Sequence, residues 1–389
     1  MSEEKHTELE DDGFRGRDVF TIVSGHFVHD TYSAFLAPLL PLLIEKLSLT
    51  LTLAGTLTAF MQAPGLLNPF IGRLADRSNA RNFVVFAPAI TGTLMSVMGI
   101  IPNYYALVVL LIFAGFSVAA FHVPAPAMVA RASGNRVGKA MGWFMAGGEL
   151  GRTLGPIIAV WAVTTWTLES MFRVAIIGWL VSGILYWRLR DIPAESKKAD
   201  YSFLPQMWRI FLPLGIIILF RSLMTVSMTT YLPTFMNMKG ANLWLAGAAL
   251  SIMEGAGVIG ALLSGAISDR IGRKAVFLVS SLFSPILMIA FLNVSGWWLV
   301  PVLLLLGLSS LSIGPVFLAL IQDHFSEHRA AANGIFMLLS FISRSLGMLL
   351  VGIAGDHIGL ESAFLWSALI AFLTLPGVFF LPGKMRPAL

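Results

Sequence analysis

Twelve stretches of about 20 mostly apolar residues follow one another along this chain. A helix of that length spans the hydrocarbon core of a bilayer, which is roughly 30 Å thick. Charged residues make up only 12% of the 389 residues, about half the usual share of a soluble domain, so most of the surface faces lipid. The sequence therefore predicts an all-α membrane protein with helices over residues 18–45, 53–72, 82–101, 104–130, 137–165, 169–188, 207–236, 243–268, 275–294, 297–322, 329–354 and 361–381.

One connection is long and polar, and it separates the first six predicted helices from the last six. It reads RDIPAESKKADYSFLPQ and is rich in charge. This pattern predicts a cytoplasmic tail, a six-helix bundle, a cytoplasmic linker, a second bundle and another cytoplasmic tail, over residues 1–17, 18–189, 190–206, 207–382 and 383–389.

The lysines and arginines are distributed unevenly between the two sides of the predicted bundle. Twenty of the 26 lie before the first helix, in the even-numbered connections or after the last helix. Because cytoplasmic loops carry this excess, we predict a multi-pass inner-membrane protein with both termini in the cytoplasm. The first 12 residues are polar and rich in acid, so we expect no cleavable signal peptide. The basic residues are then topology signals, and no nucleic-acid partner is expected.

The two halves repeat short patterns at a nearly constant offset. GRLADRSNAR at 72–81 matches GAISDRIGRK at 265–274, an offset of 193. GRTLGPI at 151–157 matches SRSLGML at 343–349, an offset of 192. Parallel repeats about an axis along the membrane normal are a known transporter architecture. Twelve transmembrane helices in two pseudo-symmetric six-helix bundles are therefore expected.

The two Gly-x-x-x-Asp-Arg loops resemble the signature of the major facilitator superfamily, and the resemblance covers essentially the whole chain. The segments HFVHD, PLLPLL, FHVPAPAMVARASGNRVGKA, GGELGRTLGPII and GDHIG are similar to its fosmidomycin-resistance group, although Ile112 stands where many drug–proton antiporters have arginine. The resemblance implies the major facilitator fold, antibiotic-resistance efflux and proton antiport. It also implies loops that latch the halves together in the outward-facing state. The gating residues expected on this basis are Gly72, Asp76, Arg77, Gly265, Asp269 and Arg270.

Ionisable residues inside predicted spans indicate a binding site, because charge at membrane depth is costly and usually functional. Arg152 and Arg344 occupy equivalent positions in the two halves, so two guanidinium groups could hold a carboxylate, phosphate or phosphonate. The predicted substrate-binding residues are Arg152, Arg344, Arg221, Glu254 and His122. Structural alternatives remain open: Arg152 can pair with Glu149 on its own helix, Arg221 can pair with an acid, and His122 can simply pack.

Asp30 is the predicted proton carrier, because a carboxyl group removed from water binds and releases protons nearer neutral pH. His26 lies one helical turn before it on the same face, His29 is adjacent, and histidine titrates in the physiological range. Glu149 is a further predicted proton-coupling residue. The alternative is that Asp30 is permanently hydrogen-bonded across the bundle.

Several chemistries are excluded by what the sequence lacks. Without cysteine there is no disulfide and no thiolate metal site. No nucleotide-binding GxxxxGK[ST] and no hydrolase HExxH or GxSxG occurs, so we expect neither an enzyme nor a cofactor or metal. The sequence favours a monomeric secondary transporter that moves a small anionic or amphipathic organic solute by alternating access, with proton-coupled efflux as the leading interpretation. Proton-coupled uptake of an organic anion and a passive channel are the alternatives.

Overall fold

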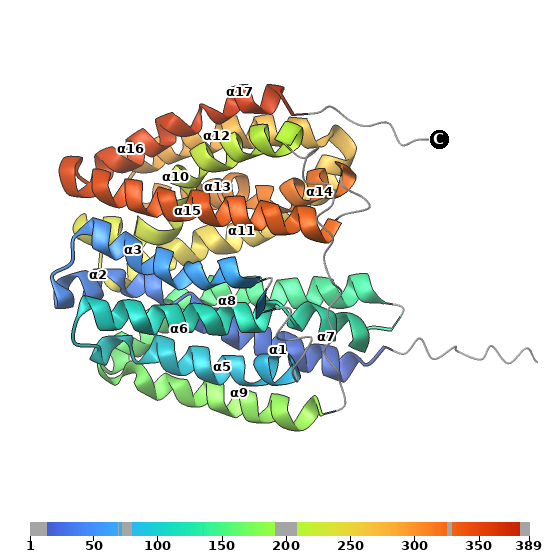
Figure 1. Ribbon diagram of the computed structural model, residues 1–389. Coiled ribbons are helices and arrows are strands. Elements are labelled where there is room, and N and C mark those ends of the chain that lie inside the picture. Colours follow the sequence, from blue (N-terminus) through green and yellow to red (C-terminus); the bar gives the residue numbers. More distant parts are fainter. Residues whose placement is uncertain are drawn as a thin grey trace, which may run out of the picture.

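The computed structural model describes residues 14–68, 70–71, 80–134, 136–190, 208–324 and 329–381. Every regular element among these residues is a helix, and the helices run side by side between two ends of the molecule (Figure 1). α1 (Gly16–Ser33) begins, and α17 (Thr374–Phe379) finishes, at the same end. We call this the terminal end, and the opposite one the distal end.

The helices form two halves that lie one above the other in Figure 1. The first half contains α1, α2 (Leu36–Leu47), α3 (Leu51–Gln62), α5 (Ala80–Ser96), α6 (Tyr104–His122), α7 (Ala125–Ala132), α8 (Val137–Thr165) and α9 (Ala175–Arg188). The second half contains α10 (Trp208–Met238), α11 (Leu243–Ile271), α12 (Arg273–Asn293), α13 (Leu299–Ser310), α14 (Gly314–His324), α15 (Arg329–Ile358), α16 (Leu360–Ala371) and α17.

The prediction of an all-α fold with membrane-spanning helices is confirmed. Ten segments of the described chain are long and apolar enough to cross a bilayer. The other two of the twelve predicted spans correspond to α8, which carries Glu149 and Arg152, and to the shorter apolar segment Leu51–Leu67. Apart from Arg190, the predicted linker lies outside the described residues, and the predicted domain limits stay predictions.

Four of the predicted spans are each built from two helices, the last of them from α16 and α17, and in the other three a proline lies at the interruption. Pro38, Pro124 and Pro315 have no backbone N–H, so each leaves the carbonyl four residues earlier without its helical donor. The first span changes from α1 to α2, the fourth from α6 to α7, and the tenth from α13 to α14. These interruptions leave polar backbone groups in the middle of the spans, and one of them places His122 at the end of α6.

The apolar core has a different organisation at the two ends. At the distal end one cluster joins residues of both halves, including Leu57, Tyr231 and Met348. Towards the terminal end each half has its own cluster, around Phe121 in the first half and Phe277 in the second. The two halves are therefore packed together distally and have separate cores on the other side.

An ion pair at the distal end is repeated in both halves. Lys46 Nζ lies 2.6 Å from Glu169 Oε1, and Lys239 Nζ lies 2.6 Å from Glu361 Oε2. The hydrogen bond from Lys46 lowers the pKa of the Glu169 carboxyl. The two lysines are 193 positions apart and the two glutamates 192, so the internal repeat found in the sequence is also present in the contacts.

Candidate functional site

A buried polar cluster surrounds Asp30 in the first half. The Asp30 side chain is 2% exposed, with Oδ2 3.3 Å from His26 Nε2 and Oδ1 3.3 Å from His122 Nε2. Arg152 Nη1 lies 3.4 Å from Oδ2. Three helices supply these groups, since His26 and Asp30 belong to α1, His122 ends α6 and Arg152 lies on α8.

Close packing of α1 against α8 brings the cluster together. A side chain at Gly148 would overlap the His26 ring, and one at Gly151 would overlap the carbonyl of Phe27. The glycines of the fifth predicted span therefore allow α1 and α8 to pack closely, because only a residue without Cβ leaves room for the neighbouring helix.

Both histidines of the cluster have one ring nitrogen held by a backbone carbonyl. His26 Nδ1 lies 2.8 Å from Phe144 O, and His122 Nδ1 lies 2.9 Å from Val118 O. A carbonyl only accepts hydrogen bonds, so each Nδ1 carries the proton and donates it. In neutral histidines the Nε2 atoms are then acceptors, although they lie 3.2 Å from each other and beside the Asp30 carboxylate.

This convergence of acceptors requires a positive species. With no proton between them, two imidazole lone pairs and a carboxylate repel one another in a site of low dielectric constant. A proton on either Nε2 turns the same distances into charge-assisted hydrogen bonds. We call Asp30, His26 and His122 the Asp30 cluster; a proton shared among them would relieve this repulsion.

The same three side chains are close enough to be considered as metal ligands. Their ligand atoms lie within 4.8 Å of one another, and two histidines with a carboxylate are a common ligand set. The guanidinium of Arg152, however, lies against the same carboxylate. A fixed positive charge at that distance repels a divalent cation about twice as strongly as a proton, so the geometry disfavours a divalent metal ion.

Arg152 has the intrahelical partner that the sequence allowed. Its Nη2 bonds Glu149 Oε1, three residues earlier on α8. The side chains of Arg152 and Glu149 are 43% and 26% exposed, so the pair lies between the buried Asp30 cluster and an accessible space.

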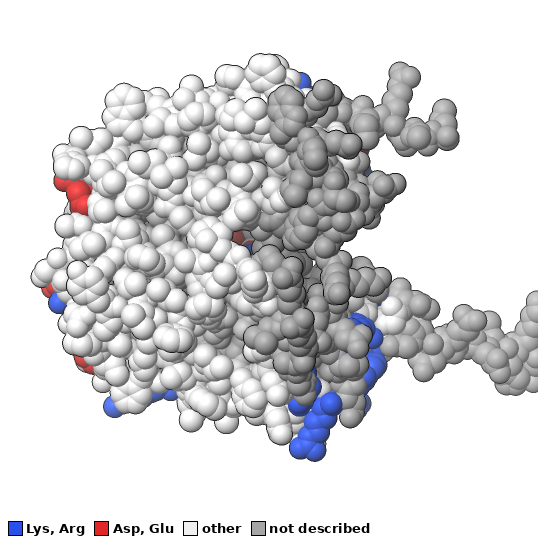
Figure 2. Space-filling model, in the orientation of Figure 1, with Lys and Arg blue, Asp and Glu red and all other residues white. Residues whose placement is uncertain are grey.

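Glu254 on α11 and Arg344 on α15 contribute charges from the second half. Arg344 interacts electrostatically with both Glu254 and Arg152, so the two halves meet through these charges. In the described part of the chain, Arg344 has no ion pair, and its side chain is exposed. Figure 2 shows the molecule hollowed between the halves at the terminal end, with charged atoms visible inside the hollow.

Arg221 has surroundings different from those predicted. It is buried, and its Nη2 donates to Ser280 Oγ at 2.8 Å and to the carbonyls of Ser310 at 2.7 Å and Ser309 at 3.3 Å. Those carbonyls are available because α13 ends there. These contacts hold Arg221 at the interrupted span inside the second half, through a hydroxyl and carbonyls in place of the acid considered from the sequence. The substrate-binding role predicted for Arg221 stays a prediction.

Among the described residues, neither ring nitrogen of His29 has a hydrogen-bond partner. It is fully buried, and its ring stacks on Phe121 with centroids 4.5 Å apart. The proton-coupling role predicted for His29 stays a prediction, and packing within the first-half core describes its contacts.

The distal end contains contacts that the sequence reasoning did not identify. Asp356 on α15 accepts hydrogen bonds from Leu51 N at 2.7 Å, Thr52 N at 2.9 Å and Thr52 Oγ1 at 2.6 Å, at the start of α3. The Tyr231 hydroxyl donates towards Met348 O at 2.9 Å and Leu51 O at 3.1 Å. The first turn of α3 contains no acidic residue. In the sequence, this lack was the only indication that an acid from another helix would lie at the start of α3.

The predicted gating loops are only partly visible. Gly72, Asp76 and Arg77 lie outside the described residues. Gly265, Asp269 and Arg270 lie in the last two turns of α11, where Asp269 Oδ1 pairs with Arg273 Nη1 at 2.5 Å. This pair lies within the second half, and the gating role stays a prediction.

The sequence and the fold are similar to those of known membrane transporters. The sequence pattern of the Major Facilitator Superfamily matches residues 22–345 and 255–388. The fosmidomycin resistance protein of Escherichia coli (strain K12) is 24% identical over 92% of this chain and 91% of its own. The multidrug resistance protein MdtG of Dickeya zeae (strain Ech586) is 23% identical over 92% of each chain. A crystal structure of the nucleoside transporter NupG superposes with a TM-score of 0.75, at 14% identity, over 94% of this chain and all of that one.

Proposed function

Because the chain belongs to the major facilitator superfamily of membrane transporters, we propose that it exports a small organic anion or amphipathic solute in exchange for protons. The proposal places it in the bacterial inner membrane as a monomer that alternates access between the two sides. The efflux direction is supported by the names of its relatives, a fosmidomycin resistance protein and a multidrug resistance protein.

The convergence of three acceptor groups in the Asp30 cluster, two imidazoles and a carboxylate, supports the proton-coupling part of the proposal. Such a cluster changes its hydrogen bonds when the proton leaves. Arg152 connects the cluster to the space between the halves, since it contacts both Asp30 and Glu149. Loss of the proton would strengthen the contact between Asp30 and Arg152, so the guanidinium would rearrange between the two protonation states. Proton and substrate would thereby be linked through one side chain.

The predicted topology assigns each end of the molecule to one side of the membrane. If the terminal end is cytoplasmic, as the distribution of lysine and arginine predicts, the hollow opens inward and the distal contacts close the outer side. In this state an anion would enter from the cytoplasm towards Arg344, Glu254 and Arg152. Rocking of the halves would then separate the distal contacts and release the substrate outside.

Proteoliposomes that contain the full chain test the proposal directly. Vesicles are loaded with a panel of labelled phosphonates, organic acids and drugs, and the outside is acidified. The proposal expects faster efflux of at least one anionic compound. Asp30→Asn should remove this acceleration, while exchange of labelled for unlabelled substrate at equal pH persists.

Glu169→Gln is the matched control, because it neutralises an exposed carboxylate of the same half without touching the cluster. It should respond to the gradient like the parent. Acid-driven uptake in place of efflux would contradict export and favour symport. A parent-like response of Asp30→Asn would contradict the assignment of the proton site.

A further inference from the structure

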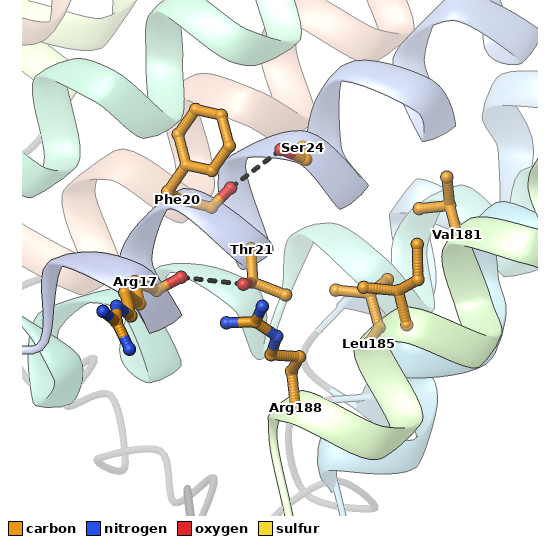
Figure 3. Close-up of a pocket in the computed structure, with 8 residues that line it drawn as sticks. Arg17, Phe20, Thr21, Ser24, Val181, Leu185 and Arg188 are labelled. Atoms are coloured by element: carbon orange, nitrogen blue, oxygen red, sulfur yellow. Dashed lines mark hydrogen bonds between the residues drawn. The ribbon is translucent and has the colours of Figure 1, made fainter.

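A groove runs along the outside of the first half between α1 and α9. It has a volume of about 440 Å³, within the range typical of ligand sites. On each helix the lining residues lie at positions i, i+3, i+4 and i+7, so a single face of α1 meets a single face of α9 (Figure 3).

Two arginines stand at the terminal end of the groove. Arg17 lies in the first turn of α1, and Arg188 is the last residue of α9. Figure 3 shows the Arg188 guanidinium reaching alongside α1 below Thr21. Asp18 is the nearby acid on α1, and it is already paired with Arg15 at 2.6 Å. Of the described residues that line the groove, none is acidic, so the mouth has a net positive charge.

The rest of the groove presents an apolar surface. Phe20 and Ile184 are 65% and 54% exposed, while Leu185 forms a buried floor. The lining hydroxyls donate to their own helix, Thr21 to Arg17 O at 2.7 Å and Ser24 to Phe20 O at 2.9 Å. The groove thus changes from cationic to apolar within the two turns between residues 17 and 24, a distance of roughly 10 Å.

From this arrangement we propose that the groove binds one anionic phospholipid, with the phosphate between Arg17 and Arg188 and an acyl chain along Phe20 and Ile184. The charge complements a phosphodiester, and the apolar part continues into the hydrocarbon layer. Arginines at the ends of transmembrane helices reach the headgroup region, and basic pockets between such helices hold anionic headgroups. The site requires only the fold and its place in a membrane, so it does not depend on the proposed substrate or coupling.

Native mass spectrometry of the detergent-purified full chain tests the site. The protein is titrated with phosphatidylglycerol and, separately, with phosphatidylcholine. Two basic contacts predict a preference for phosphatidylglycerol of about tenfold to thirtyfold. The double variant Arg17→Gln and Arg188→Gln should abolish the preference and leave phosphatidylcholine binding unchanged.

A control variant removes the same number of charges at the same end. Arg15→Gln with Arg190→Gln should keep the preference, because Arg15 pairs with Asp18 and Arg190 lies over Tyr186, outside the groove. Ser24→Phe fills the groove without changing charge and should weaken phosphatidylglycerol binding. An excess of inorganic phosphate should not displace the lipid, since it lacks the acyl chain.

Three results would overturn the proposal. Equal affinity of the parent for phosphatidylglycerol and phosphatidylcholine would show that the groove contacts membrane lipids without selecting the anionic one. Equal losses in the arginine pair and its control would assign the preference to general surface charge. Displacement by inorganic phosphate, with parent-like lipid binding in Ser24→Phe, would reduce the site to a phosphate contact.

Discussion

Arg152 and Arg344 are related by the internal repeat, yet their surroundings differ. Arg152 pairs with Glu149 and contacts Asp30. Arg344 has Glu254 as an electrostatic neighbour but no ion pair among the described residues. An arginine with unused donors beside an accessible space is the better anchor for an incoming anion, because its fork can bind a carboxylate or phosphonate through two hydrogen bonds.

Replacing Arg344 by glutamine should weaken the binding of anionic substrates. Charge-assisted hydrogen bonds contribute about 2 kcal/mol, which corresponds to roughly thirtyfold in affinity. The dissociation constant of an exported anion, measured by isothermal titration calorimetry with the purified chain, checks this. Arg344→Lys should give an intermediate loss, because it keeps the charge without the planar fork.

A neutral compound that the protein also binds provides the internal reference. Its affinity should change little in Arg344→Gln. Equal losses for the neutral and the anionic compound would show that Arg344 supports packing of α15 and does not contact the anion.

The identities of the charged residues could be predicted from sequence, but their partners could not. Charged residues are rare in membrane spans, so Asp30, Arg152 and Arg344 were identified by position alone. Arg221 met the same criterion, yet its partners are carbonyls released where α13 ends. No pattern in the neighbouring residues indicates that the interruption of one helix provides acceptors for another. The arrangement of His26 and His122 around Asp30 likewise depends on how closely α1, α6 and α8 pack.

At the scale of helices, the contact between α3 and α15 is the main polar connection between the halves at the distal end. The Asp356 carboxylate accepts from two backbone N–H groups at the start of α3, where the helix dipole favours negative charge. Asp356 and Thr52 belong to different halves and are far apart in sequence. The contact must break whenever the distal end opens, so it stabilises one conformation over the other.

Asp356→Ala should shift the protein towards a distally open conformation. Loss of a cap and of its charge at a helix terminus costs about 1–2 kcal/mol, equivalent to roughly fivefold to thirtyfold in the ratio of the two states. The native chain has no cysteine, so Tyr105→Cys and Trp297→Cys can carry a spin-label pair across the exposed distal surface. Longer label distances should become more populated in electron–electron resonance.

Glu361→Gln is the control for that measurement. It removes a carboxylate from the same end, but its partner Lys239 belongs to the same half. The distance distribution should therefore match that of the parent. If both substitutions lengthen the distances equally, surface charge controls opening and Asp356 is not a latch.

Helix positions were the most predictable part of the fold, and contacts between halves the least. Spans follow from apolar length, and the offset of about 192 residues revealed the two bundles. The interruptions at Pro38, Pro124 and Pro315 coincide with residues that cannot donate a helical hydrogen bond. The pairing of α3 with α15 could not be predicted, because the two helices belong to different halves and, in the proposed mechanism, touch in only one conformation.

At the scale of the whole molecule, the joint distal core and the two separate terminal cores match one state of the proposed rocking motion. Small residues make the distal closure possible. A Cβ at Gly55 would overlap the Tyr231 hydroxyl and lie 2.7 Å from Met348 O, and one at Gly352 would lie 2.8 Å from Leu51 O. Closure thus brings backbone against backbone across the halves, which few residues other than glycine allow.

Gly55→Ala should therefore prevent distal closure and hold the transporter open at that end. The added methyl group must displace Tyr231, whose hydroxyl bonds both Leu51 and Met348, so the closed state loses contacts while the open state loses none. We expect long distances for the distal label pair and loss of gradient-driven transport, with the variant still folded. Gly142→Ala on α8 is the matched control, because nothing lies within 4 Å of its added Cβ. Normal transport with parent-like distances in Gly55→Ala would show that the distal contacts yield easily and do not set the balance between the two states.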